Sequence, residues 1–252
     1  MLNKDNRMYI ILLSIFFIFN INTVEARTIY ANLLNNHEIT AKYEHGGKGY
    51  QAIGKDSYKG YSYGKWQIST ERRNNKPSTF DFFLKYLKEK APVFYTELHK
   101  AGGQEKAFSG DVNFRKTWKK LALDKDFQQS YDNFIFDTQV IPVYTRLDNS
   151  DNIKLDKLTT WSSENKAIQA AIKSTIIQHG SNGAFNMLSK IMLNKNVNNK
   201  DIFLKKLYEY RIFRFPRYKK RYLAEYNDLK NYLNSEKSKI ETKYANLLKI
   251  PT

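Results

Sequence analysis

Apolar residues recur at helical spacing along most of this 252-residue chain. After Ser78, a suitable N-cap, they follow the i, i+3, i+4, i+7 spacing of one buried helical face at Phe80, Phe83, Leu84 and Leu87. The same pattern continues almost to the C-terminus, so helices are expected over APVFYTELHK, FRKTWKKLA, DFQQSYDNFIFDTQVIPVYTRL, ENKAIQAAIKSTIIQHG, DIFLKKLYEYRIFRF and residues 217–248. The pattern predicts a mostly helical protein.

One stretch, residues 43–69, departs from helical spacing. Its sequence, YEHGGKGYQAIGKDSYKGYSYGKWQIS, holds six glycines and five tyrosines. Short aromatic pieces at 52–53 and 61–68 flank GKDSYKG, which is typical of a small antiparallel sheet with tight turns. A helix over residues 28–43 is expected to lead into this stretch and to end at Glu44. The predicted fold class is therefore α+β, mostly α, with one small antiparallel β-element.

Breaks in the helical pattern indicate how the chain is divided. Pro142 is expected to kink or end a helix, and Gly180 to end the helix that precedes it. Residues 148–163, DNSDNIKLDKLTTWSS, show little periodicity and many turn residues. We interpret this polar stretch as the connection between two lobes of approximately 27–148 and 162–252.

The first 26 residues, MLNKDNRMYIILLSIFFIFNINTVEA, have the pattern of a secretory signal. Two cations precede an apolar run, and cleavage-type residues follow it. The run, residues 8–21, is shorter than the roughly 20 apolar residues that a membrane-spanning helix needs. The sequence predicts a signal peptide over 1–26 and an exported domain over 27–252, periplasmic or secreted. The alternative is an uncleaved membrane anchor.

The composition limits the reactions and the binding partners that are possible for this protein. The chain has no cysteine, which excludes disulfides and thiolate catalysis. Lys and Arg number 42 against 25 Asp and Glu, a formal net charge of +17. For an exported protein this balance favours polyanionic partners such as a cell-wall polymer or an acidic envelope surface, with simple solubility as the alternative. No nucleic-acid motif is present, so no nucleic-acid partner is expected, and the protein is expected to be a monomer.

Carboxylates are the remaining candidates for catalysis. The chain contains no phosphate-binding glycine loop, no HExxH or GxSxG motif and only four scattered histidines, so no metal or other cofactor is expected. Glu44 stands where a helix should meet the glycine-rich sheet, and partial burial there raises a carboxyl pKa, as a general acid requires. Asp56 would orient water or stabilise positive charge. The alternatives are an exposed helix-end charge and a turn-forming Asp.

Three motifs together resemble a known family. They are EHGG beginning at Glu44, AIGKD ending at Asp56 and SYGKWQI beginning at Ser62. Their order is similar to that in the lysozyme superfamily, and more closely to the muramidase-like C-terminal domain of certain type VI secretion spike proteins and related wall hydrolases allied to the chitosanases. The later pieces IIQHGSNGA, LYEYR and RYKKRYLAE agree with that branch. His45 is a departure, because relatives often have a small Ser at this position.

The resemblance implies a two-lobed lysozyme-like fold and a glycosidase that cleaves the β-1,4 bond between N-acetylmuramic acid and N-acetylglucosamine in peptidoglycan strands. It implies Glu44 as the general acid and Asp56 as the second carboxylate. It also implies two groups of substrate-binding residues. Ser62, Tyr63 and Gln67 would lie on the cleft floor, and Gln178 and His179 on the opposite wall.

Several alternatives stay open at this point. A lone Glu can serve as acid and then base, so the product is either hydrolytic or an anhydro sugar, and the stereochemistry depends on the separation of the carboxylates. Chitosan is a rival substrate, although a polycation is disfavoured by the charge of +17. A rival of another class is a non-catalytic module that grips the cell wall through basic and aromatic residues.

Overall fold

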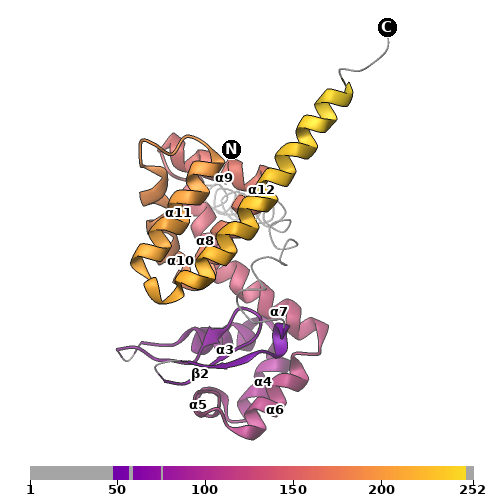
Figure 1. The fold of residues 1–252 in the computed structure, drawn as a ribbon. Coiled ribbons are helices and arrows are strands. Elements are labelled where there is room, and N and C mark those ends of the chain that lie inside the picture. The colour runs from indigo at the N-terminus through magenta and orange to yellow at the C-terminus, as the bar shows by residue number, and fades with distance from the viewer. Residues whose placement is uncertain (1–47, 57–58, 75, 248–252) are drawn as a thin grey trace, which may run out of the picture. The chain divides into compact units, whose positions relative to one another are not determined.

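The computed structural model describes residues 48–56, 59–74 and 76–247, with side chains through residue 236 and at 238. All of them belong to one compact unit, Glu38–Thr252. Figure 1 shows a small sheet with α3 to α6 grouped beside it, and α8 to α12 forming a second helical group. The predicted helix over 28–43, Glu44 and His45 lie outside the described residues. Among the described helices, none combines the length and apolarity needed to cross a membrane.

The sheet has three short antiparallel strands in the order β1-β2-β3: Ile53–Lys55, Tyr61–Tyr63 and Ile68–Ser69. A single 3₁₀ turn, η1 (Gly49–Gln51), precedes it. This confirms the small antiparallel β-element predicted from the glycine and tyrosine pattern. The registers set Gly54 opposite Ser62, and Ser62 opposite Ser69.

Alternation along these strands separates two faces of the sheet. Cross-strand partners share a face, and successive residues point to opposite faces. Gly54, Ser62 and Ser69 therefore face one side, and a Cβ at Gly54 would lie 2.5 Å from Gln67 Oε1, which places Gln67 on that side too. The reverse face carries Ile53, Lys55, Tyr61 and Tyr63.

An aromatic core lies behind the sheet. Helices pack around it: α3 (Thr79–Lys90), α4 (Pro92–Lys100), α5 (Gly103–Ser109), α6 (Val112–Leu121) and α7 (Lys125–Ile135). The Tyr63 ring contacts those of Phe80, Phe114 and Trp118, with centroids 5.1–5.5 Å apart. Ser78 caps α3 with a full capping box, as its position predicted. The buried face of α3 is Phe80, Phe83 and Leu87.

Pro142 coincides with an irregular helical segment. A π-helical segment, η2 (Phe136–Val140), follows α7, and α8 (Ile141–Asp148) then begins with Pro142 in its first turn. Proline has no N–H and disturbs the turn before it, which accounts for the irregular winding at this point.

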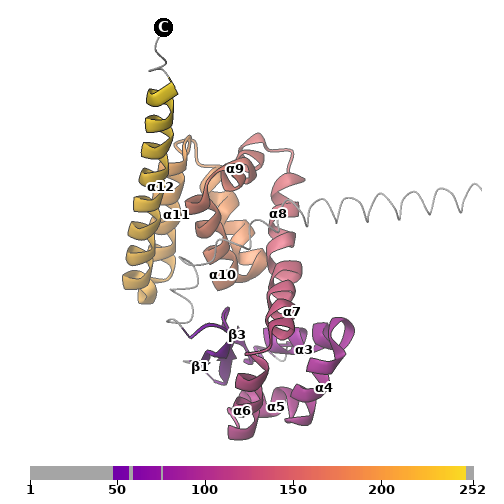
Figure 2. The ribbon, with the colours of Figure 1, turned by 90° about the vertical axis from the view of Figure 1, so that its right-hand side faces the viewer.

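The second helical group is built around α10 (Lys166–Met192). Its partners are α8, α9 (Ile153–Glu164), α11 (Lys200–Arg214) and α12 (Lys219–Leu247), and a short η3 (Pro216–Tyr218) joins the last two. Figure 2 shows α11 and α12 side by side. The first ten residues after Lys166 are all buried, and four of them, Gln169, Lys173, Ser174 and Thr175, are polar. Gly180, at φ 67° and ψ 171°, breaks the helical backbone.

Helix α9 corrects the interpretation of residues 148–163 as an irregular connection. Asn152 caps the helix by accepting the N–H of Lys154, and Leu155, Leu158 and Trp161 are buried. The helix packs on α10. The turn-type residues before Ile153 end α8 and cap α9, and burial of three large side chains stabilises the helix despite its weak period.

Candidate active site

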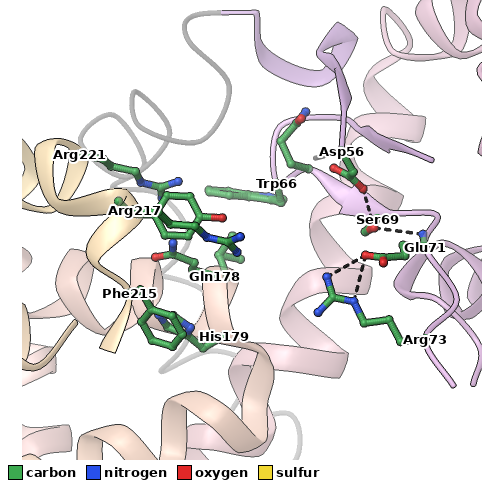
Figure 3. Close-up of a pocket in the computed structure, with 13 residues that line it drawn as sticks. Asp56, Trp66, Ser69, Glu71, Arg73, Gln178, His179, Phe215, Arg217 and Arg221 are labelled. Carbon is green, nitrogen blue, oxygen red and sulfur yellow. Dashed lines mark hydrogen bonds and ion pairs between the residues drawn. The ribbon is translucent and has the colours of Figure 1, made fainter. Parts of the chain in front are cut away.

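A polar pocket of about 490 Å³ lies between the sheet and the helical segments that surround Gly180 and η3. Figure 3 shows Asp56, Ser69, Glu71 and Arg73 on one side of it, and Gln178, His179, Phe215, Arg217 and Arg221 on the other. Thirteen residues line the pocket: Asp56, Trp66, Gln67, Ser69, Glu71, Arg73, Ile177, Gln178, His179, Phe215, Arg217, Tyr218 and Arg221.

Asp56 follows β1 on the pocket side of the sheet. Its carboxylate accepts a hydrogen bond from the hydroxyl of Ser62, and another from Ser69 Oγ at 2.8 Å. The two serines come from β2 and β3, so the register of all three strands determines the orientation of this carboxylate. Asp56 lines the pocket and forms no ion pair among the described residues.

Glu71 is a second pocket carboxylate, which the sequence analysis missed. Arg73 binds it through Nη2 at 2.7 Å and Nε at 3.0 Å. Ser69 Oγ, which donates to Asp56, also accepts the backbone N–H of Glu71 at 3.1 Å. The signal that was available is its position two residues after a strand residue on the pocket face.

Gln67 reaches the pocket through a tight turn. The backbone N–H of Gln67 and its side-chain Nε2 both donate to the carbonyl of Gly64, at 3.1 and 2.8 Å. Gly64 has φ +79° and Gln67 has φ +51°. A Cβ at Gly64 would lie 2.7 Å from the ring of Tyr131, so only glycine fits this close approach. Gln67 thus lies in the pocket lining.

Trp66 separates the pocket from a buried polar cluster. The indole N–H donates to Asp132 Oδ1 at 2.8 Å, and Lys65 and Lys173 place their Nζ atoms 4.8 and 4.6 Å from the ring centroid. Burial lowers the pKa of Lys173 to about 7; Lys65 acts in the same direction and Asp132 opposes it. Trp66 is only 3 % exposed, yet it lines the pocket.

Gln178 and His179 line the opposite wall of the pocket, just before α10 breaks at Gly180. Gln178 Oε1 accepts a hydrogen bond from Arg211 Nη2 at 2.7 Å. The His179 ring stacks on Phe215 with centroids 4.5 Å apart. Burial, followed by the positive charges of Arg211 and Arg221, lowers the pKa of His179 to about 4.

Two arginines that the sequence analysis did not select complete this wall. Arg217 lies in η3, 4.6 Å from the ring of Tyr218, and Arg221 lies in the first turn of α12. Both line the pocket. The basic stretch RFPRYKKRY was visible in the sequence, but only the packing of α12 on α11 shows which of its cations reach the pocket.

Tyr63 and Ser62 need a correction. Both were expected on the cleft floor, yet adjacent residues of a strand point to opposite faces. Tyr63 is fully buried in the aromatic core, and its hydroxyl donates to the carbonyl of Ala107 at 2.8 Å. Ser62 does face the pocket side but is only 5 % exposed, beneath Asp56. Tyr63 is therefore a core residue, and Ser62 orients Asp56.

The pocket has a chemistry that suits polar ligands. Two carboxylates and a serine line the sheet side, and cations and rings line the helical side. In the part of the chain that the structure describes, no group of three or more His, Asp or Glu side chains could hold a metal. The predicted general acid, Glu44, lies outside the described residues.

The small sheet beside a mostly helical body is typical of a lysozyme-like fold. Two solved chitosanases share it: the GH46 enzyme GsCsn46A of Gynuella sunshinyii in complex with chitotetraose (TM-score 0.55, 14% identity, 81% of this chain and 88% of that chain) and the native enzyme of Bacillus subtilis MY002 (TM-score 0.54, 17% identity, 81% and 89%). At these identities the likeness shows the fold alone.

Family membership follows from the sequence itself. The chain belongs to the family described as Type VI secretion system spike protein VgrG3-like, C-terminal, whose profile matches residues 37–237. This confirms the family resemblance and the fold class. No curated protein matches the chain in a sequence search.

Proposed function

We propose that the protein is a peptidoglycan-cleaving glycosidase that acts on the β-1,4 bond between N-acetylmuramic acid and N-acetylglucosamine. The observation that supports this most is Asp56, a carboxylate oriented by Ser62 and Ser69 at the wall of a polar pocket. In a glycosidase with a lysozyme-like fold, a carboxylate held in this way positions a water molecule or stabilises the oxocarbenium-like charge.

Glu44 is the proposed general acid, on the basis of the family resemblance, and would protonate the leaving oxygen. Asp56 is the better second carboxylate, because the charge of Glu71 is already neutralised by Arg73. Hydrogen bonds from two serine hydroxyls hold the Asp56 carboxylate in one orientation, as positioning of a nucleophilic water requires.

The charge of the pocket supports peptidoglycan as the substrate. Arg217 and Arg221 line the helical wall. Peptidoglycan carries lactyl and peptide carboxylates, whereas chitosan is a polycation that these guanidinium groups would repel. The proposal includes export through the signal peptide predicted over residues 1–26, since the substrate lies outside the cytoplasm.

The test is incubation of the purified protein with purified peptidoglycan, followed by mass analysis of the released fragments. We expect muropeptides from the wild type, and a loss of at least about a hundredfold in rate for Glu44→Gln and Asp56→Asn, because an amide supplies neither the proton nor the negative charge. Asp151→Asn, at an exposed carboxylate outside the pocket, should retain wild-type activity.

The products distinguish the alternatives. Reducing ends identify a hydrolase, and anhydro ends identify a lytic transglycosylase. Full activity of Glu44→Gln would refute the proposed mechanism. Turnover of chitosan without turnover of peptidoglycan would identify chitosan as the substrate. Sedimentation with the cell wall without release of fragments would indicate a binding module.

A further inference from the structure

A second hollow, of about 780 Å³, lies on the reverse face of the sheet and has a different character from the pocket. We call it the basic groove, and its cations are Lys48, Lys55, Arg115, Lys116 and Lys119. They come from the segment before η1, from β1 and from α6. Among the described residues, no carboxylate lines it.

The basic groove and the pocket open on opposite sides of one sheet. Lys55 pairs with Tyr61 across β1 and β2, and both line the groove. Asp56, the next residue, lines the pocket. Successive side chains of a strand point to opposite faces, which accounts for this separation. The part of a ligand that binds in the groove is therefore not the part that binds in the pocket.

The cations of the groove are not neutralised within the described part of the chain, where none of the five forms an ion pair. Neighbouring cations do have partners, such as Lys106 with Asp111 at 3.5 Å. Arg115 is half-buried, its guanidinium lies 6.0 Å from the Tyr61 ring, and its buried Nε has no hydrogen-bond partner among the described groups.

Three cations of the groove lie on one helix, α6, where neighbouring like charges lower the stability of the helix. Arg115 and Lys119 are an i,i+4 pair of α6, and Lys116 and Lys119 are an i,i+3 pair, and both arrangements are destabilising in a helix. Lys119 gains from its place in the last turn, where cations complement the helix dipole. Arg115 follows the N-cap Asp111 by four residues, which offsets part of its repulsion, whereas Lys116 has no carboxylate three or four residues away in α6. An anionic ligand would offset the repulsion that remains.

We propose that the basic groove binds carboxylates of the peptide stems of a peptidoglycan strand other than the one being cut. The inference rests on the proposed function, which makes this polymer the substrate. A concave surface lined by cations suits an extended chain with spaced carboxylates rather than a planar lipid surface. Because the groove faces away from the pocket, it engages a neighbouring strand of the network and raises the effective concentration of enzyme at its insoluble substrate.

The test uses a charge reversal at two exposed positions of the groove, Lys116→Glu/Lys119→Glu. The matched control, Lys120→Glu/Lys125→Glu, changes the net charge equally at exposed positions that do not line the groove. Binding is measured by sedimentation with purified peptidoglycan sacculi in the cold. We expect a fivefold to tenfold weaker affinity for the groove variant at low salt, less than a twofold change for the control, and a smaller difference as salt is raised.

Two further substrates identify the ligand. On sacculi whose carboxyl groups have been converted to neutral amides, wild type and groove variant should bind equally. On soluble glycan strands stripped of peptides, both should be cut at the same rate, whereas intact sacculi should be degraded more slowly by the groove variant. If wild type cuts neither substrate, the proposed function fails. The sedimentation result still decides whether the groove binds peptidoglycan carboxylates.

Three results would overturn the inference: equal weakening by the control pair, groove-dependent binding that survives amidation, and a groove-dependent loss of binding to double-stranded DNA without any loss on sacculi. Thermal unfolding checks that each variant is folded. If the charge reversal lowers the unfolding temperature, Lys116→Gln/Lys119→Gln replaces it, and its affinity for sacculi should still fall relative to Lys120→Gln/Lys125→Gln.

Discussion

His179 lies in the pocket wall, yet it is poorly suited to donate a proton at neutral pH. Its ring is stacked on Phe215 and faces the positive charges of Arg211 and Arg221. Burial and these two cations lower its pKa to about 4. The imidazole is therefore neutral near pH 7, and its contribution to the pocket wall is an uncharged ring.

The protonation of His179 yields a prediction on stability. Between its folded pKa of about 4 and the ordinary value of 6.5, the unfolded chain binds a proton that the folded chain does not. The free energy of unfolding should therefore fall as pH is lowered through this window, and less steeply in His179→Phe, which keeps the stacking. Urea unfolding at pH 7 and 4.5, with an NMR titration of His179, checks this. A midpoint above 6 would contradict it.

The sheet determines which side chains face the pocket and which face the aromatic core. Its alternation directs Asp56, Ser62 and Ser69 to the pocket and sends Tyr63 into the aromatic core. The turn between β2 and β3 depends on one close approach, that of Gly64 to Tyr131. The Tyr131 hydroxyl donates to the carbonyl of Tyr63 at 2.9 Å and accepts the N–H of Trp66 at 3.1 Å.

Gly64→Ala should therefore be strongly destabilising. The new Cβ would clash with the Tyr131 ring at 2.7 Å, and the backbone is in the left-handed region, so we expect a loss of about 3 kcal/mol in the free energy of unfolding. Gly49→Ala is the control: φ is +56°, but among the described residues nothing beyond its two chain neighbours lies within 4 Å of the new Cβ, so only the backbone cost of about 1 kcal/mol remains. Equal losses in urea unfolding would show that the contact with Tyr131 is unimportant.

At the scale of the whole molecule, a buried charge joins three helices behind the pocket. Arg211 of α11 is fully buried, with Nη1 at 3.6 Å from Glu225 Oε2 of α12. Its Nη2 donates to Ser174 Oγ at 3.1 Å and to Gln178 Oε1 at 2.7 Å, both in α10. The guanidinium thus fixes the side chain of a pocket residue through contacts between distant parts of the sequence.

Removal of one charge of this pair should cost more than removal of both. Arg211→Met leaves Glu225 buried without its partner, and we expect a loss of about 3–5 kcal/mol in the free energy of unfolding. Arg211→Met/Glu225→Met should be less destabilised than Arg211→Met alone. As a control, Arg72→Met breaks an exposed ion pair with Asp81 and should cost less than about 1 kcal/mol. Additive losses in urea unfolding would contradict this coupling.

The sequence alone determined the features that depend on local spacing. The helical period, the Ser78 cap, the sheet marked by glycines and tyrosines, and the family resemblance were all predicted and confirmed. Each of these follows from residues close together in the chain, where backbone geometry limits the choices. Helix α9 was missed because its stability comes from burial of Leu155, Leu158 and Trp161 rather than from local propensity.

The tertiary structure alone decided which chemistry meets in space. Packing of η3 and α12 brings Arg217 and Arg221 to the same pocket as Asp56 and Glu71, more than 140 residues earlier in the sequence. It also separates Lys55 from Asp56 onto opposite faces of the sheet. Pairings between distant segments depend on how whole elements pack, and the free energy that selects one packing is a sum over the entire core, which no local pattern contains.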